Sequence, residues 1–137
     1  MSARSKARKR AVDALFSADL RSEAAEAMID TALEHAEDPA AQQAIFDYAK
    51  QIVVGVAEHQ GEIDEALETY AHGWSLSRMP NLDRAILRAA TWEILFNDEV
   101  PDAVAVDEAV ELAKEYSTDD SAGFINGLLN KISATKA

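Results

Sequence analysis

The chain of 137 residues contains no cysteine, only three prolines and only five glycines. Without cysteine it has no disulfide, no cysteine-ligated zinc and no thiol nucleophile, which is typical of a protein from a reducing compartment. No run approaches the roughly 18 consecutive apolar residues that a membrane-spanning helix needs. This length fits one compact domain whose apolar core needs no metal or disulfide to hold it together.

The scarcity of glycine and proline favours long helices. Alanine, leucine, isoleucine and glutamate recur with helical spacing, and no run alternates between apolar and polar residues as a strand does. We therefore predict an all-α helical bundle of six or seven helices. They are expected over residues 5–20, 23–36, 41–58, 63–74, 82–96 and 101–116, with a last helix after the polar run 117–121.

A loop-like run at residues 73–80 (GWSLSRMP) is predicted to join two packed helical halves of a single domain. The expected halves are residues 1–74 and 80–137 of the domain 1–137. Asn81 is predicted to cap the next helix, and hydroxyls in the run 117–121 to cap the last one. The segment 82–96 is apolar on more than one face, which places it in the middle of the core.

Basic residues are few and gathered at one end. The first ten residues hold five of the 13 basic groups and no acid, so the net charge of −12 divides into +5 and, for residues 11–137, −17. The helix dipole disfavours cations at a helix N-terminus, and residues that go against such a local preference often belong to a functional site. The sequence therefore predicts an anion-binding site at the start of the chain, on a body whose acidic surface attracts basic partners.

Enzyme signatures are missing from the sequence. Neither a phosphate-binding loop nor a GxGxxG dinucleotide motif is present. The residues three before His35, His59 and His72 are not glutamate, so the helical di-iron pattern fails. Carboxylate pairs one turn apart are typical of a solvated acidic helix, and no serine, histidine and aspartate constellation stands out. We predict no catalytic residue, no cofactor and no metal.

The basic start has two interpretations. Arg4 and Arg8 lie one helical turn apart with other cations beside them, which suits a strip that follows a nucleic-acid backbone. The alternative is a solvated basic tail, because terminal basic runs are common.

Two aromatic residues near the last helix also have two interpretations. Phe124 lies at the edge of the apolar stripe, where its ring is placed to stack on an unpaired base. The pattern favours the alternative of a core phenylalanine, with Gly123 and Gly127 one turn apart admitting another helix closely. Tyr116 poses the same choice between an RNA contact and a core residue.

Three segments resemble the bacterial transcription antitermination family NusB. They are residues 7–16 (ARKRAVDALF), 83–94 (DRAILRAATWEI) and 106–131 (VDEAVELAKEYSTDDSAGFINGLLNK). The resemblance implies an all-helical bundle of two packed subdomains and a non-enzymatic RNA-binding factor. Such a factor pairs with NusE, a small-subunit ribosomal protein, binds BoxA RNA in ribosomal transcripts, and acts in an antitermination complex with RNA polymerase.

The resemblance also implies functional residues. Expected RNA contacts are the basic start, a neighbouring aromatic position and the beginning of the last helix, here Arg4, Lys6, Arg8, Lys9, Arg10, Phe16, Tyr116, Asp120 and Phe124. The expected contacts to the ribosomal protein are Asp83 and Arg84. Cations hold phosphates, rings stack on bases, and a carboxylate accepts hydrogen bonds from base edges, so Asp120 is expected to specify sequence.

Several alternatives remain open at this stage. A purely protein-binding acidic adaptor explains the charge without RNA, and a related domain occurs fused to RNA methyltransferases, although no cofactor-binding domain is found here. Exposed apolar helix faces are compatible with a homodimer. An acid-poor amphipathic start also resembles an organellar transit peptide, but a cytoplasmic protein with no membrane segment is favoured.

Overall fold

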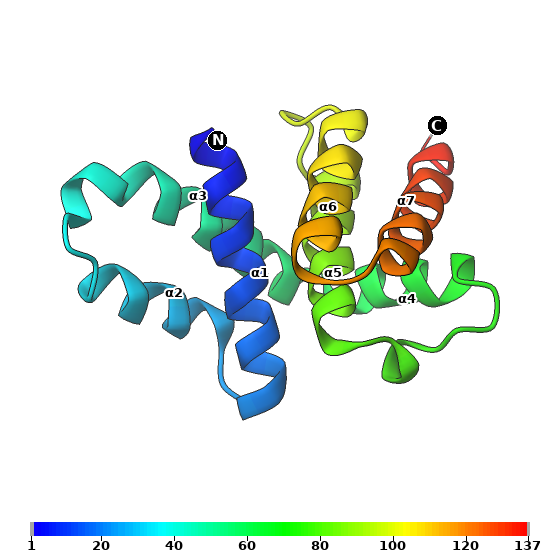
Figure 1. The fold of residues 1–137 in the computed structure, drawn as a ribbon, viewed down its shortest axis with the longest axis horizontal. Helices are drawn as coiled ribbons and strands as arrows, with labels where there is room; N and C mark the ends of the chain where they lie inside the picture. The colour runs from blue at the N-terminus through cyan, green and yellow to red at the C-terminus, as the bar shows by residue number, and fades with distance from the viewer. Residues whose placement is uncertain (1, 137) are drawn as a thin grey trace.

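The computed structural model describes residues 2–136, and all regular structure in this part of the chain is helical. Seven α-helices and one short 3₁₀ helix follow one another (Figure 1), which confirms the predicted all-α bundle. Their bounds are α1 Ala3–Arg21, α2 Ala25–Glu34, α3 Pro39–Glu58, α4 Gln60–Tyr70, η1 Leu76–Arg78, α5 Asn81–Phe96, α6 Asp102–Tyr116 and α7 Asp119–Ala134.

Helix α1 begins inside the basic run because other groups offset its unfavourable charge. Ser2 caps the helix by accepting a hydrogen bond from the backbone N–H of Ser5 at 3.0 Å. Two acidic residues from the second half of the chain also lie beside this helix start. Arg4 pairs with Glu99 at 3.2 Å, and the Ser5 hydroxyl donates a hydrogen bond to Glu108. These acids stabilise a helix start that contains no acidic residue of its own.

The helices form two groups in space. Helix α1 packs on α2, α3 and α5, while α4, α6 and α7 gather around α5 on the other side (Figure 1). The expected division of the chain between residues 74 and 80 stays a prediction. Because α4 packs mainly against α5 and α7, its contacts favour a division between α3 and α4.

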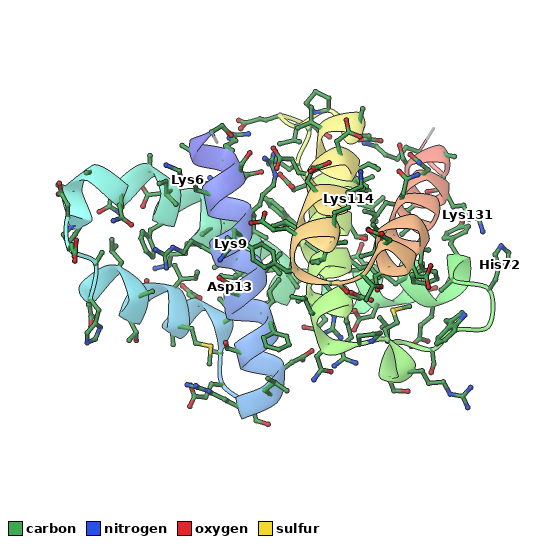
Figure 2. All side chains as sticks on the ribbon, viewed as in Figure 1. Lys6, Lys9, Asp13, His72, Lys114 and Lys131 are labelled. Atoms are coloured by element: carbon green, nitrogen blue, oxygen red, sulfur yellow. The ribbon has the colours of Figure 1, made fainter. Side chains whose placement is uncertain are left out.

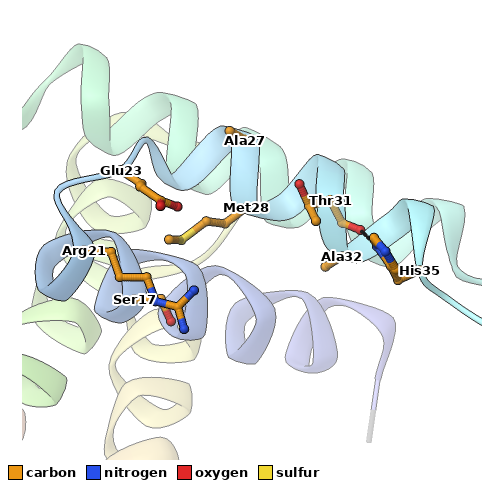
Figure 3. Close-up of a pocket in the computed structure, with 8 residues that line it drawn as sticks. All are labelled: Ser17, Arg21, Glu23, Ala27, Met28, Thr31, Ala32 and His35. Atoms are coloured by element: carbon orange, nitrogen blue, oxygen red, sulfur yellow. Dashed lines mark hydrogen bonds between the residues drawn. The ribbon is translucent and has the colours of Figure 1, made fainter.

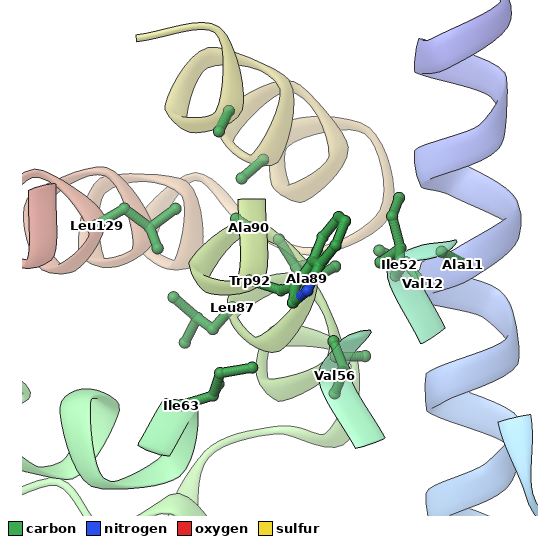
Figure 4. Packing of buried hydrophobic residues seen from close by; sticks show 14 of the residues in the cluster. Ala11, Val12, Ile52, Val56, Ile63, Leu87, Ala89, Ala90, Trp92 and Leu129 are labelled. Carbon is green, nitrogen blue, oxygen red and sulfur yellow. The ribbon is translucent and has the colours of Figure 1, made fainter. Parts of the chain in front are cut away.

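Helix α5 lies at the centre of the core, as its apolar residues on several faces indicate. Trp92 is its largest buried side chain and packs among residues of α1, α3 and α6 (Figure 4). Gly55 of α3 makes this contact possible, because a Cβ there would lie 2.0 Å from the indole nitrogen of Trp92. A larger residue at position 55 would therefore force α3 and α5 apart.

Local details differ from the sequence expectations. Asn81 does not cap α5: the preceding Pro80 takes the cap position, and the Asn81 side chain accepts a hydrogen bond from Arg84. Trp74 is predicted as the last residue of the helix over 63–74, but it lies beyond the end of α4 and is 54 % exposed. The cause is the backbone, which turns at His72 and Gly73, both with positive φ, and so ends the helix before Trp74.

Two further positions are more open than the sequence predicts. Leu20, the last residue of the helix predicted over 5–20, is 58 % exposed because it lies in the last turn of α1, just before the chain leaves through the left-handed Ser22. Gly123 and Gly127 admit no neighbouring helix, since a Cβ at either position would meet no atom within 4 Å. Among the described residues, no helix is both long and apolar enough to cross a membrane.

Candidate nucleic-acid interface

The inner face of α1 carries a buried arginine. Arg8 donates from Nε to Oε1 of Glu93 on α5 at 2.8 Å, and a second guanidinium nitrogen lies 3.5 Å from Glu108 of α6. The side chains of Arg8 and Glu93 are only 6 % and 2 % exposed. Burial lowers the pKa of Arg8, but the hydrogen bond and charge of Glu93 outweigh it and raise the pKa above its ordinary value. Arg8 is therefore a fixed, charged internal group whose guanidinium is engaged by Glu93 and Glu108.

Tyr48 of α3 completes this buried cluster. Its hydroxyl donates to Oε2 of Glu93 at 2.5 Å and accepts a hydrogen bond from Asn97 at 3.0 Å. Burial, together with the hydrogen bond to Glu93, raises the pKa of the Tyr48 phenol. The guanidinium of Arg4 lies 4.3 Å from the centroid of the tyrosine ring. The cluster thus ties the start of α1 to α3 and α5 without help from a nucleic acid.

The remaining cations of the run lie on the outer face of α1. Lys6, Lys9 and Arg10 line an open groove of about 530 Å³ between α1 and the start of α3, with Asp13, Ala41, Gln42 and Ile45. Figure 2 shows Lys6 and Lys9 on successive turns of α1, before Asp13. Lys6 and Arg10 are exposed. The basic start is therefore ordered helix with a cationic outer face.

A second feature lies where α6 ends and α7 begins. Thr118 caps α7 by accepting a hydrogen bond from the N–H of Ser121 at 3.0 Å, as the hydroxyl-rich run predicts. Beside this cap is an apolar pocket of about 260 Å³ lined by Trp74, Met79, Pro80, Asp83, Asp120, Ser121 and Phe124. The rings of Trp74 and Phe124 lie 6.4 Å apart in a tilted arrangement. The pocket thus combines aromatic walls with the exposed carboxylate of Asp120.

Lys9 joins the two features. Its ammonium pairs with Asp13 at 3.3 Å and lies 4.9 Å from the ring centroid of Tyr116, the last residue of α6. Tyr116 is 44 % exposed, so its ring is a surface group and not a core residue. The structure brings Lys9 to the ring of Tyr116, 107 positions further along the chain, and a cation beside an exposed aromatic ring is a combination that binds single-stranded nucleic acids.

Three other expected contacts are engaged inside the chain. Phe16 is half-buried and packs against the core. Asp83 is buried, and its carboxylate accepts hydrogen bonds from Ser117 and Ser121. Arg84 pairs with Asp19 at 3.0 Å and donates to the carbonyl of Leu76. Neither Asp83 nor Arg84 presents its charged group freely to a partner, because both groups already serve helix contacts.

Sequence reasoning missed Glu93, Tyr48 and Trp74. Glu93 had a visible signal, since it is the one charged residue in the apolar run 89–96. Arg8 also had one, because it lies four residues before Val12 and thus on the buried stripe of α1. Trp74 had none, since only the chain reversal at His72 and Gly73 exposes it.

A further groove separates α1 from α2. It has a volume of about 440 Å³ and contains Met28 on its floor and Arg21 and His35 on its rim (Figure 3). None of the RNA contacts expected from the sequence lines this groove. Within residues 2–136 no group of three or more histidine, aspartate or glutamate side chains is arranged to hold a metal ion.

Comparison with known proteins gives a consistent result. The profile of the NusB family matches residues 5–134. The transcription antitermination protein NusB of Leifsonia xyli subsp. xyli is 58 % identical over 99 % of this chain and 94 % of its own length. Its counterpart in Clavibacter sepedonicus is 53 % identical over the full length of both chains.

Solved structures agree with these sequence relatives. Thermotoga maritima NusB superposes with a TM-score of 0.85 at 35 % identity, covering 98 % of this chain and 92 % of the other. The antitermination factor in a crystal structure of NusB and NusE with double-stranded RNA superposes with a TM-score of 0.83 at 26 % identity, covering 99 % of both chains. The chain therefore belongs to the NusB family of transcription antitermination proteins.

Proposed function

We propose that this protein binds BoxA-type RNA of ribosomal transcripts together with the ribosomal protein NusE, and that this complex acts with RNA polymerase to promote ribosomal RNA transcription. The observation that carries the proposal is the approach of Lys9 to Tyr116, which places the cationic face of α1 beside the exposed aromatic end of α6. The structural relative crystallised with NusE and double-stranded RNA supports the same ligand class.

The outer face of α1 holds the phosphates in this proposal. Lys6, Lys9 and Arg10 on this face and Arg4 at the start of the helix are the contacts, since each has an exposed or partly exposed side chain on an ordered helix. Arg8 has a different role and anchors the helix through Glu93. Fixing the cations before RNA arrives reduces the ordering entropy that binding costs.

The end of α6 and the start of α7 read the bases. Tyr116 and Phe124 offer rings for stacking, and Trp74 extends the apolar wall beside Phe124. Asp120 supplies the only exposed carboxylate that lines this pocket, and it accepts hydrogen bonds from base amino or imino groups. Phosphate contacts do not discriminate between bases, so specificity resides in this pocket.

The ribosomal partner is attracted by the acidic body of the molecule. Residues 11–137 carry a net charge of −17, and ribosomal proteins are generally basic. Long-range attraction of this kind raises the association rate and weakens as salt is added. Asp83, Arg84 and Phe16 contribute to the partner or RNA surfaces chiefly by holding the helices that form them.

A titration tests this proposal. A BoxA-like RNA, a scrambled RNA of equal length and a duplex form are titrated with the full chain, with and without NusE, at roughly 50 and 200 mM salt. Four phosphate contacts predict a slope of log affinity against log salt of about −2.8, because single strands give about −0.7 for each contact. A slope near zero, or equal affinity for BoxA-like and scrambled RNA with NusE present, would contradict the proposal.

Specificity is tested separately from affinity. Asp120→Asn removes the acceptor charge and is expected to change the preference between BoxA-like and scrambled RNA while leaving the salt slope unchanged. Asp107→Asn is a matched control, because Asp107 is exposed on the middle of α6, outside the pocket. Unchanged preference in the Asp120 variant would remove this residue from the recognition surface.

A further inference from the structure

A buried carboxylate underlies the turn between α6 and α7. Asp83 of α5 is only 3 % exposed. The Ser117 hydroxyl donates to its Oδ1 at 2.8 Å, and the Ser121 hydroxyl donates to its Oδ2 at 2.7 Å. In the described part of the chain no lysine or arginine forms an ion pair with Asp83, so hydroxyl groups alone satisfy its side chain.

The position of Asp83 on its helix makes this burial tolerable. It lies in the first turn of α5, where the positive end of the helix dipole stabilises a negative charge. A buried carboxylate is nevertheless costly unless it is hydrogen-bonded, so the two serine hydroxyls are needed. An apolar residue would fill the same space but would leave the turn without an attachment to α5.

The attachment extends through the whole turn. Thr118 donates its hydroxyl to the Ser121 hydroxyl at 3.0 Å and accepts the backbone N–H of Ser121 at 3.0 Å. Three hydroxyl groups in a five-residue segment are thereby linked to one carboxylate. Tyr116 immediately precedes this segment, and Asp120 lies within it, in the first turn of α7. The directions of both side chains depend on the conformation of the turn.

We infer that Asp83 is a positioning residue for RNA recognition: it borders the pocket, but its carboxylate is buried and engaged by two serine hydroxyls, so it acts by fixing the turn at residues 117–121, and through it Tyr116 and Asp120. This inference rests on the proposed RNA-binding function. It assigns Asp83 a task inside the molecule in place of a direct contact with a protein partner. The cationic face of α1 is tied down separately by Glu93, so the two parts of the RNA surface are held by different residues.

The experiment uses Asp83→Asn and Ser121→Ala in the full chain, each titrated with BoxA-like and scrambled RNA. Both variants are expected to reduce the preference for BoxA-like RNA by about tenfold, the equivalent of one hydrogen bond to a charged group. The salt slope should stay at the parental value because the cations of α1 are untouched. The double variant should lose no more than either single variant.

Two controls separate positioning from loss of stability. Ile94→Val lies on the same helix, fully inside the core, and is expected to lower the melting temperature without changing the RNA preference. In a background that carries both Asp120→Asn and Tyr116→Ala, Asp83→Asn is expected to have little further effect on the preference, since both groups that it positions are already altered. A structural role alone would give additive losses that follow the melting temperature.

The outcomes distinguish this inference from the proposed function. If the parent shows no preference for BoxA-like RNA even with NusE, the proposed function fails. If the parent shows the preference and Asp83→Asn retains it, the positioning role is overturned. A change in the salt slope, or a loss that adds to that of the background with both Asp120→Asn and Tyr116→Ala, overturns it equally.

Discussion

Helix α5 carries two buried carboxylates, Glu93 and Asp83, whose charges are compensated differently. Glu93 lies in the last turn, where the negative end of the helix dipole adds to its charge, and it is paired with the guanidinium of Arg8 at 2.8 Å. Asp83 lies in the first turn, where the positive end of the helix dipole stabilises its negative charge, and hydrogen bonds from two serine hydroxyls are sufficient to compensate its burial. Position along one helix thus decides which kind of partner a buried acid needs.

The comparison also separates two tasks. Glu93 fixes the start of α1 and with it the cationic face that is proposed to hold phosphates. Asp83 fixes the turn before α7 and with it the groups that are proposed to read bases. One central helix therefore sets the spacing between the two parts of the surface, because both attachments begin on α5.

The largest effect is expected for Glu93→Gln. It leaves the buried Arg8 with only its longer contact to Glu108 at 3.5 Å, so the free energy of unfolding should fall by about 3–5 kcal/mol, as for other broken buried pairs. Urea unfolding followed by circular dichroism measures this change. The double variant Arg8→Met with Glu93→Leu should recover much of the loss, because it removes both charges together. A double variant no more stable than Glu93→Gln would show that the pair itself is not the cause.

The next largest effect is expected for Tyr48→Phe. It removes a hydrogen bond to a charged acceptor, which costs about 1.5–3 kcal/mol. The pKa of Tyr48 is raised by burial and by Glu93, so its contribution to stability is complete below the ordinary tyrosine pKa of 10.0 and is lost as the pH rises above it. Unfolding measured from pH 9 to about pH 11 should show a shallower alkaline decline in the variant. Parallel curves would contradict the assignment.

A smaller loss of stability is expected at Asp83, whose charge the helix dipole already stabilises. Ser117→Ala removes one of two hydroxyls from Asp83 and should lower the free energy of unfolding by about 1 kcal/mol. Urea unfolding of Ser117→Ala and Glu93→Gln, measured side by side, checks this ranking of the two free-energy losses. If Ser117→Ala destabilises the protein as much as Glu93→Gln does, the first and last turns of α5 do not differ in the way the dipole requires.

Sequence patterns were sufficient for the helices and for the centre of the core. The apolar residues on several faces of 82–96 placed α5 correctly, because a helix that packs against neighbours on most of its sides needs apolar residues on more than one face. They were insufficient for the polar clusters. Arg8 and Glu93 are 85 residues apart, and Asp83 and Ser121 are 38 apart, so only the packed helices bring them together. A basic run predicts a cationic surface but not which of its members turns inward.

The smallest change in stability, and a large change in binding, is expected on the outer face of α1. Lys6→Gln with Arg10→Gln alters exposed side chains outside the buried cluster, of which Arg10 lies 5.1 Å from the ring centroid of Phe46, so the free energy of unfolding should change by less than about 1 kcal/mol. Loss of two phosphate contacts should make the salt slope shallower by about 1.4. Lys131→Gln, exposed on α7 near its end, is the matched charge control. Equal salt slopes for the double variant and this control would mean that phosphates do not lie along α1. The division of roles, in which Arg8 anchors the helix and the exposed cations bind RNA, would then be wrong.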